Sequence, residues 1–145
     1  MSAPSAPPVP AAPQSALPLA ARWPQIHGID PDDVCERLGG DVALFGLMLR
    51  RWLNGLAAGD FAAVVIAPDA SGDSLRIAHA ARAHDVRGVA GLLGAAAIAQ
   101  QAAVVELACR GGDCAHAAAA SQQLAQQLRQ LAADAAEFMA AGDTA

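Results

Sequence analysis

The stretch Ala-His-Asp-Val-Arg-Gly-Val-Ala-Gly-Leu-Leu-Gly-Ala occupies residues 83–95. On a helix, a histidine, an arginine and three small residues of this stretch recur at three- and four-residue spacing along one face. These residues are His84, Arg87, Gly88, Gly91 and Ala95. A different face carries the apolar residues Val86, Ala90, Leu93 and Ala97. The spacing therefore predicts a helix that buries its apolar face and presents His84 outward.

The two glycines beside this histidine need a physical reason. Glycine inside a helix costs roughly 1 kcal/mol relative to alanine, so Gly88 and Gly91 weaken the predicted helix. Close approach by another backbone is a good reason to keep them. An arginine one turn from an imidazole disfavours its protonation, but it stabilises a phosphoryl group carried on the ring through charge-assisted hydrogen bonds. The pattern favours a phosphohistidine at His84.

The composition of the whole chain also favours helices. Of its 145 residues, 39 are alanine, and only 3% are aromatic. Alanine, leucine, arginine and glutamine are good helix formers, whereas sheets need the β-branched and aromatic residues that are scarce here. The length suits one domain with a tail, because roughly 100–150 residues is the commonest domain size. We therefore expect a single all-α domain.

Charge and hydropathy exclude several classes of protein. The net charge is −5, and the basic residues are nine scattered arginines without a lysine, so the basic stripe of a nucleic-acid-binding protein is missing. The longest apolar stretches, 62–67 and 89–99, fall short of the ~18 residues that a membrane span needs. No secretory signal is recognisable, and three cysteines, Cys35, Cys109 and Cys114, do not make a disulfide framework. We expect a cytoplasmic protein with reduced cysteines and without direct membrane or nucleic-acid contact.

Capping residues and glycines divide the chain into helices. Aspartates at three places are expected to be N-caps, and glycine pairs are expected to end helices. The caps are Asp30, Asp41 and Asp113, and the pairs are Gly39-Gly40 and Gly111-Gly112. The expected helices cover residues 31–38, 42–56 with an extension past Gly59 left open, 73–94, 96–110 and 114–138, with a loop over 68–72. Four long helices with short connections predict an antiparallel four-helix bundle with a short additional N-terminal helix.

The N-terminal segment differs in composition from the rest. Seven of the nine prolines fall within the first 24 residues, among alanine and serine. Such a segment is typical of a flexible linker, so we assign residues 1–24 to a linker whose end Trp23 and Ile26 attach to the domain. The domain itself is expected over residues 25–141, with a disordered tail over 142–145. The linker suggests that the domain is tethered to a larger protein.

The run His84-Asp85-Val86-Arg87-Gly88, continued to Leu93-Gly94-Ala95, resembles the histidine-phosphotransfer (HPt) domain of bacterial multistep phosphorelays. The motif of that family is His-x-x-Lys/Arg-Gly followed by small residues and Leu-Gly-Ala. Weaker matches lie upstream in Leu38-Gly39-Gly40-Asp41 and downstream in Glu106-Leu107 leading to Gly112-Asp113. The resemblance covers about residues 29–138.

The resemblance implies a function and a set of site residues. His84 would accept a phosphoryl group from an aspartate of a receiver domain and pass it to an aspartate of a response regulator, with Arg87 stabilising the phosphoryl group. Residues around it would dock the receiver: Ile77, Ala80, Ala81, Asp85, Gly88, Gly91 and Ala95. The receiver would supply Mg²⁺, because this segment has no carboxylate cluster to hold a metal. The chain would be a monomeric phosphocarrier without independent turnover, in the cytoplasmic C-terminal part of a hybrid sensor histidine kinase.

Two positions depart from the family's pattern and keep alternatives open. Asp85 follows the histidine where threonine, serine or a basic residue is usual, and Leu92 stands where a polar residue is common. A helical adaptor that binds receivers or other proteins through the same face without phosphorylation is therefore the first alternative. The second is a metal or redox protein that uses Cys109, Cys114 and His116.

Overall fold

The computed structural model describes residues 23–56 and 70–143, and all regular structure in these two stretches is α-helical. The helices are α1 Pro31–Arg37, α2 Val42–Gly55, α3 Ala70–Leu92, α4 Ala96–Gly111, α5 Cys114–Asp134 and α6 Ala136–Asp143. The predicted all-α fold class is confirmed for this part of the chain. None of these helices is long and apolar enough to cross a membrane.

The predicted aspartate caps begin three of the helices. The side chain of Asp30 accepts from the backbone N–H groups of Asp32 and Asp33 at the start of α1. Asp41 accepts from Leu44 N–H at 3.0 Å, and Asp113 accepts from His116 N–H at 3.0 Å. Each cap satisfies a donor that the helix cannot, which stabilises the helix by about 1 kcal/mol.

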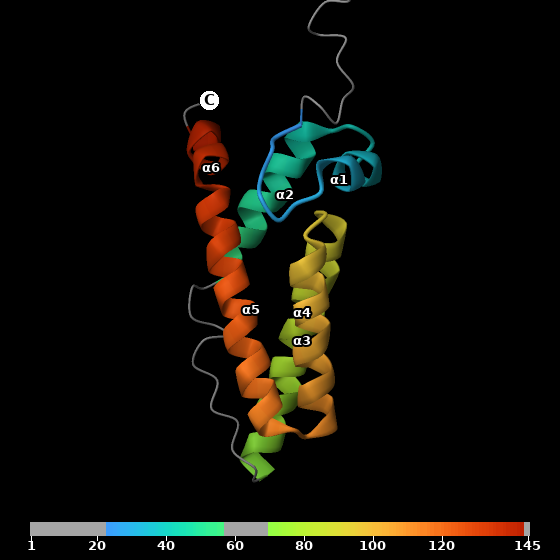
Figure 1. Ribbon diagram of the computed structural model, residues 1–145, viewed down its shortest axis with the longest axis vertical. Coiled ribbons are helices and arrows are strands. Elements are labelled where there is room, and N and C mark those ends of the chain that lie inside the picture. The colour runs from blue at the N-terminus through green and yellow to red at the C-terminus, as the bar shows by residue number, and fades with distance from the viewer. Residues whose placement is uncertain (1–22, 57–69, 144–145) are drawn as a thin grey trace, which may run out of the picture.

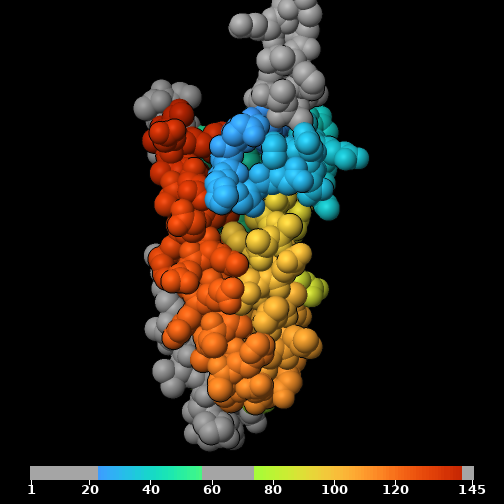
Figure 2. Space-filling model, viewed as in Figure 1, coloured from blue at the N-terminus to red at the C-terminus, as the bar shows by residue number. Residues whose placement is uncertain are grey.

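Figure 1 shows α3 and α4 side by side as an antiparallel hairpin, with α5 returning along α4 and α6 continuing in line with α5. The short α1 lies across the turn between α3 and α4, where Asp30 N–H donates to Gly94 C=O at 2.9 Å. Figure 2 shows the blue and cyan residues, from Trp23 through α1, covering this end of the hairpin. The α2 helix packs against α6, where Phe45 and Phe138 have ring centroids 5.8 Å apart.

Alanine makes up much of the core. The large side chains that are fully buried include Val34, Phe45, Leu49, Leu93, Val105 and Leu124. Between them, alanines on α3, α4 and α5 are fully buried: Ala80, Ala83, Ala90, Ala102 and Ala117. Small side chains allow helix axes to approach toward the lower end of the usual ~8–10 Å range. The composition thus produces closely spaced helices.

Gly94 is the residue on which the turn between α3 and α4 depends. Its φ is +77°, a left-handed conformation that glycine adopts without strain. A Cβ at this position would lie 2.9 Å from the carbonyl oxygen of Asp30 and 3.3 Å from Cβ of Val34. Glycine therefore satisfies both the turn geometry and the close approach of α1.

Trp23 is buried against Phe45, with ring centroids 5.3 Å apart, so it attaches the chain before α1 to the domain, as the sequence predicted. Two helix boundaries differ from the predicted ones. The α3 helix begins at Ala70 and not at residue 73, because an isolated glycine at 72 is tolerated inside a helix. A helix also continues to Asp143, into the expected tail. The remainder of the predicted linker, residues 1–22, and the extension past Gly59 lie outside the described residues.

The expected last helix is divided in two at Ala135. Its N–H still donates to Leu131 C=O at 2.9 Å, and its C=O accepts from Met139 N–H at 2.9 Å. The hydrogen-bond ladder therefore passes through the junction, which explains why α5 and α6 stay in line (Figure 1). The junction leaves Phe138 on the side that faces α2.

Candidate functional site

His84 lies on an outward face of α3, and its side chain is 55% exposed. The neighbouring α4 places Glu106 beside it, with the Nδ1 atom of His84 3.2 Å from both Oε1 and Oε2 of the carboxylate. The antiparallel register of α3 and α4 brings these two residues together although 22 positions separate them. The site is therefore an exposed imidazole that is held through one of its two nitrogens.

Glu106 is the centre of a small ionic cluster. Its side chain is only 12% exposed, and two arginines flank it: Arg87 with Nη1 3.5 Å from Oε2, and Arg110 with Nε 3.3 Å from Oε1. Burial on its own would raise the pKa of this carboxyl, but the hydrogen bond with His84 and the charge of Arg87 outweigh burial and lower the pKa. Glu106 is consequently ionised at neutral pH.

The ionised carboxylate determines which ring nitrogen of neutral His84 carries the proton. A carboxylate only accepts hydrogen bonds, so Nδ1 must donate, and the lone pair of the neutral ring then lies on Nε2. Nε2 has no hydrogen-bond partner among the described residues. The site thus presents a nitrogen nucleophile to solvent from a ring of fixed tautomer.

The surface beside His84 has open space at Gly88 and Gly91. A Cβ built on Gly88 or on Gly91 would meet no atom within 4 Å. The alternative reason for these glycines, tight packing between helices of this chain, is therefore not supported by the described residues. Within the described part of the chain, no close packing at these two glycines offsets the stability that they cost the helix.

The predicted docking residues divide into two groups. Ile77, Ala81, Asp85 and Gly88 are exposed, and Gly91 is half-buried. Ala80 and Ala95 are fully buried, so their prediction as partner contacts is wrong. Ala80 points toward the protein interior, and Ala95 lies in the turn where α1 covers the hairpin.

Asp85 does not belong to the Glu106 cluster. It lines a hollow of about 390 Å³ between α2 and α3, together with Arg82 and an apolar floor that includes Trp52, Leu56 and Val89. A step of one residue along a helix turns the side chain by about 100°, which carries Asp85 away from α4. The aspartate that departs from the family's pattern therefore lies on the α2 side of His84 and not beside Arg87.

A second histidine on α3, His79, is part of the core. Its Nε2 lies 2.8 Å from Oγ of Ser121 on α5, and that hydroxyl donates to Ala117 C=O at 2.6 Å. Because the hydroxyl has a single proton, His79 Nε2 is the donor to Ser121. Burial, and secondarily the charge of Arg82, lowers the pKa of His79. His79 therefore bonds α3 to α5 and offers no accessible nucleophile.

The alternative site at Cys109, Cys114 and His116 lacks the arrangement that metal binding requires. Within residues 23–56 and 70–143, no three metal-ligating side chains come together. Cys109 is buried, and burial raises the pKa of its thiol. A protonated thiol is a poor ligand and a poor nucleophile.

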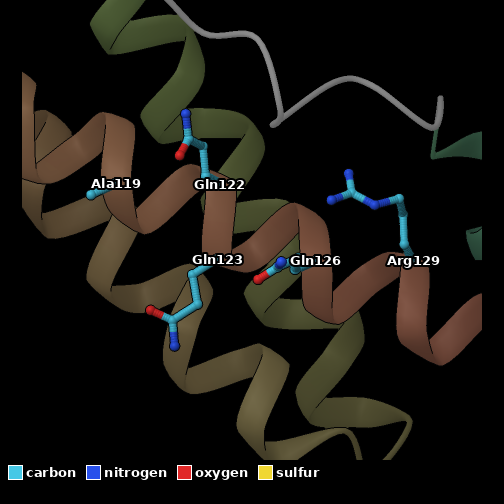
Figure 3. A pocket seen from close by; sticks show the side chains of 5 residues that line it. All are labelled: Ala119, Gln122, Gln123, Gln126 and Arg129. Atoms are coloured by element: carbon cyan, nitrogen blue, oxygen red, sulfur yellow. The ribbon is translucent and has the colours of Figure 1, made fainter.

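Another hollow lies along α5, and the described residues that line it include no acid, base or nucleophile. Its volume is about 560 Å³, and the described residues that line it are Ala119, Gln122, Gln123, Gln126 and Arg129. Figure 3 shows the amide and guanidinium side chains extending from one helix. Amides are neither acids nor bases at neutral pH, so this surface does not compete with the His84 site.

Two residues of the site were not predicted as such from the sequence. Glu106 entered only as part of a weak family match, and Arg110 was not singled out. The spacing of Glu106 and Arg110 by four residues indicates an ion pair on a helix, but it does not show that a histidine of another helix joins them. Comparisons with known proteins add nothing to this geometry: no family model, no curated protein and no solved structure matches the chain.

Proposed function

We propose that this chain is a histidine-phosphotransfer domain, an antiparallel four-helix bundle made by α2, α3, α4 and α5 with α6, in which His84 carries the phosphoryl group. The observation that carries the proposal is the bond between Nδ1 of His84 and Glu106, which leaves Nε2 as an exposed nucleophile. Buried histidines such as His79 lack this combination of a held ring and an open nitrogen.

The reaction is a reversible transfer between an aspartate of a receiver domain and His84. The lone pair of Nε2 attacks phosphorus, the N–P bond forms, and the P–O bond to the receiver breaks with its electron pair going to the aspartate carboxylate. The Nδ1 proton stays on the ring. The ring becomes positively charged in this step, and the Glu106 carboxylate that already accepts from Nδ1 stabilises that charge.

Arg87 supports the transfer from the same helix. Its guanidinium lies one turn from His84 and is half exposed, so it can turn from Glu106 toward the phosphoryl oxygens at small cost. Mg²⁺ belongs to the receiver in this proposal, since Glu106, the carboxylate that contacts His84, is already paired with two arginines. The chain acts as a phosphocarrier without turnover of its own.

The bare surface around Gly88 and Gly91 suits the approach of the receiver's active site to His84. A receiver must bring its aspartyl phosphate within bonding distance of Nε2, and a longer side chain at either glycine would hold it away. The partners that we propose are the receiver of a hybrid histidine kinase and that of a response regulator. The chain serves as the cytoplasmic phosphotransfer part of such a kinase.

Phosphotransfer from a ³²P-labelled receiver tests the proposal. Wild type is expected to acquire an acid-labile label, His84→Gln to acquire none, and His116→Gln, which alters another exposed histidine, to label as wild type does. Undiminished labelling of His84→Gln would overturn the assignment of the acceptor. If wild type binds the receiver but acquires no label, the proposed phosphocarrier function is wrong and the chain is the non-phosphorylated adaptor.

A further inference from the structure

Arg110 is a second cation at the site, contributed by α4. Its Nε lies 3.3 Å from Oε1 of Glu106, the same oxygen that lies 3.2 Å from Nδ1 of His84. The arginine and the histidine therefore meet at one carboxylate oxygen. Arg87 reaches the other oxygen from α3, so guanidinium groups from two helices flank the imidazole's partner.

The charges in this cluster are suited to an additional anion. Glu106 supplies one negative charge against the two arginines, so these three side chains leave one positive charge beside the ring when the imidazole is in the neutral form that attack on phosphorus requires. A phosphoryl dianion on Nε2 would place its charge next to this excess. Arginine binds phosphate oxygens through paired, charge-assisted N–H donors, which makes it better suited to the task than a point charge.

The side chain of Arg110 is free enough to bind two acceptors. It is 58% exposed, and its bond to Glu106 uses Nε, which leaves the two terminal NH₂ groups to donate elsewhere. Exposed ion pairs contribute only about 0–1 kcal/mol, so their geometry adjusts readily when a stronger acceptor arrives. Glu106 thus holds Arg110 beside His84 without immobilising it.

We propose that Arg110 is a second phosphoryl-binding arginine, whose terminal NH₂ groups donate to the phosphoryl group on His84 while Nε stays on Glu106. This inference rests on the proposed function. Arg110 binds the product of the transfer and not the free ring, so it shifts the equilibrium of the reaction toward phosphohistidine. Arg87 and Arg110 then hold the phosphoryl group from two sides.

The transfer equilibrium between a labelled receiver and the full chain tests this role. Arg110→Gln is expected to shift the ratio of phosphohistidine to aspartyl phosphate about fivefold toward the receiver, the size of one partly exposed charge-assisted hydrogen bond. Arg110→Lys keeps the charge and should recover part of the shift. Arg129→Gln, which removes an exposed arginine from α5, should leave the ratio unchanged.

Binding of the unphosphorylated chain to the receiver separates phosphoryl binding from docking. The proposal expects the affinity of Arg110→Gln to stay within about twofold of wild type, and its thermal unfolding to match wild type. An unchanged transfer ratio, or a loss of affinity that accounts for all of the effect, would overturn the role of Arg110. Failure of wild type to accept any label would instead refute the proposed function, and the two failures are therefore distinguishable.

Discussion

Gly88 allows a sharp test of the idea that the surface beside His84 is kept bare for a partner. It lies inside α3 with ordinary helical φ, and a Cβ built on it meets no atom within 4 Å. Gly88→Ala therefore recovers the full helix propensity of alanine without a steric penalty, about 1 kcal/mol. For a domain of this size that gain raises the melting temperature by about 5 °C.

The same substitution is expected to slow phosphotransfer. Gly88 lies one turn from His84 on the same face, so the added methyl group stands where the receiver must approach. Thermal unfolding followed by circular dichroism measures the first effect, and quenched-flow transfer from a labelled receiver measures the second. If Gly88→Ala is more stable but transfers at the wild-type rate, the receiver does not need the space beside His84 that the glycine leaves. If Gly88→Ala is less stable than wild type, the surroundings of residue 88 are not open.

Gly94→Ala is the matched control, because the same change from glycine to alanine should destabilise the protein at this position. Its φ of +77° strains any L-residue, and the new Cβ would lie 2.9 Å from the backbone oxygen of Asp30. The left-handed conformation alone costs about 1–2 kcal/mol, and the contact with a backbone atom adds to it. Gly94→Ala should lower the melting temperature, whereas an unchanged value would show that the turn tolerates a side chain.

Two further predictions concern side chains that fix the histidines. Glu106→Gln removes the negative charge beside Nδ1 of His84, and it should slow transfer from a labelled receiver about tenfold, the size of a hydrogen bond to a charged group; an unchanged rate would exclude a role of this charge in the transfer. The second concerns acid stability: because the pKa of buried His79 is lowered from 6.5, the unfolded chain binds its proton more readily than the folded chain. Stability from this residue is full above about pH 6.5 and falls below it, by up to about 1.4 kcal/mol per pH unit, until the pH passes the folded pKa. Denaturant unfolding at pH 7.5 and 5.5 should show this loss in wild type and a smaller one in His79→Leu, and equal losses would contradict it.

Local features of the fold could be predicted from the sequence because they depend on neighbouring residues only. Asp30, Asp41 and Asp113 cap helices through donors two or three positions away, and the left-handed Gly112 ends α4 where a glycine pair was expected to stop it. The start of α3 was missed because glycine within a helix and glycine at its end are alike in sequence.

The site could be predicted in part. Helical spacing placed His84, Arg87 and Gly88 on one outward face, but spacing on one helix does not reveal what the next helix brings to it. The same limit explains the error at Ala80, which lies four residues before His84 and is covered by neighbouring helices. Glu106 and Arg110 join the site through the register between α3 and α4, which no local pattern contains.

The alanine-rich core and the chemistry at His84 are connected through this register. Ala80 lies one turn before His84 on α3, and Ala102 lies one turn before Glu106 on α4; both are fully buried. Small side chains at these positions let the two helix axes come close, and only then can a glutamate side chain reach an imidazole on the neighbouring helix. Larger residues would push α3 and α4 apart and lengthen the 3.2 Å contact that fixes the tautomer. We therefore expect a larger side chain at Ala80 to weaken the contact between His84 and Glu106 from inside the protein.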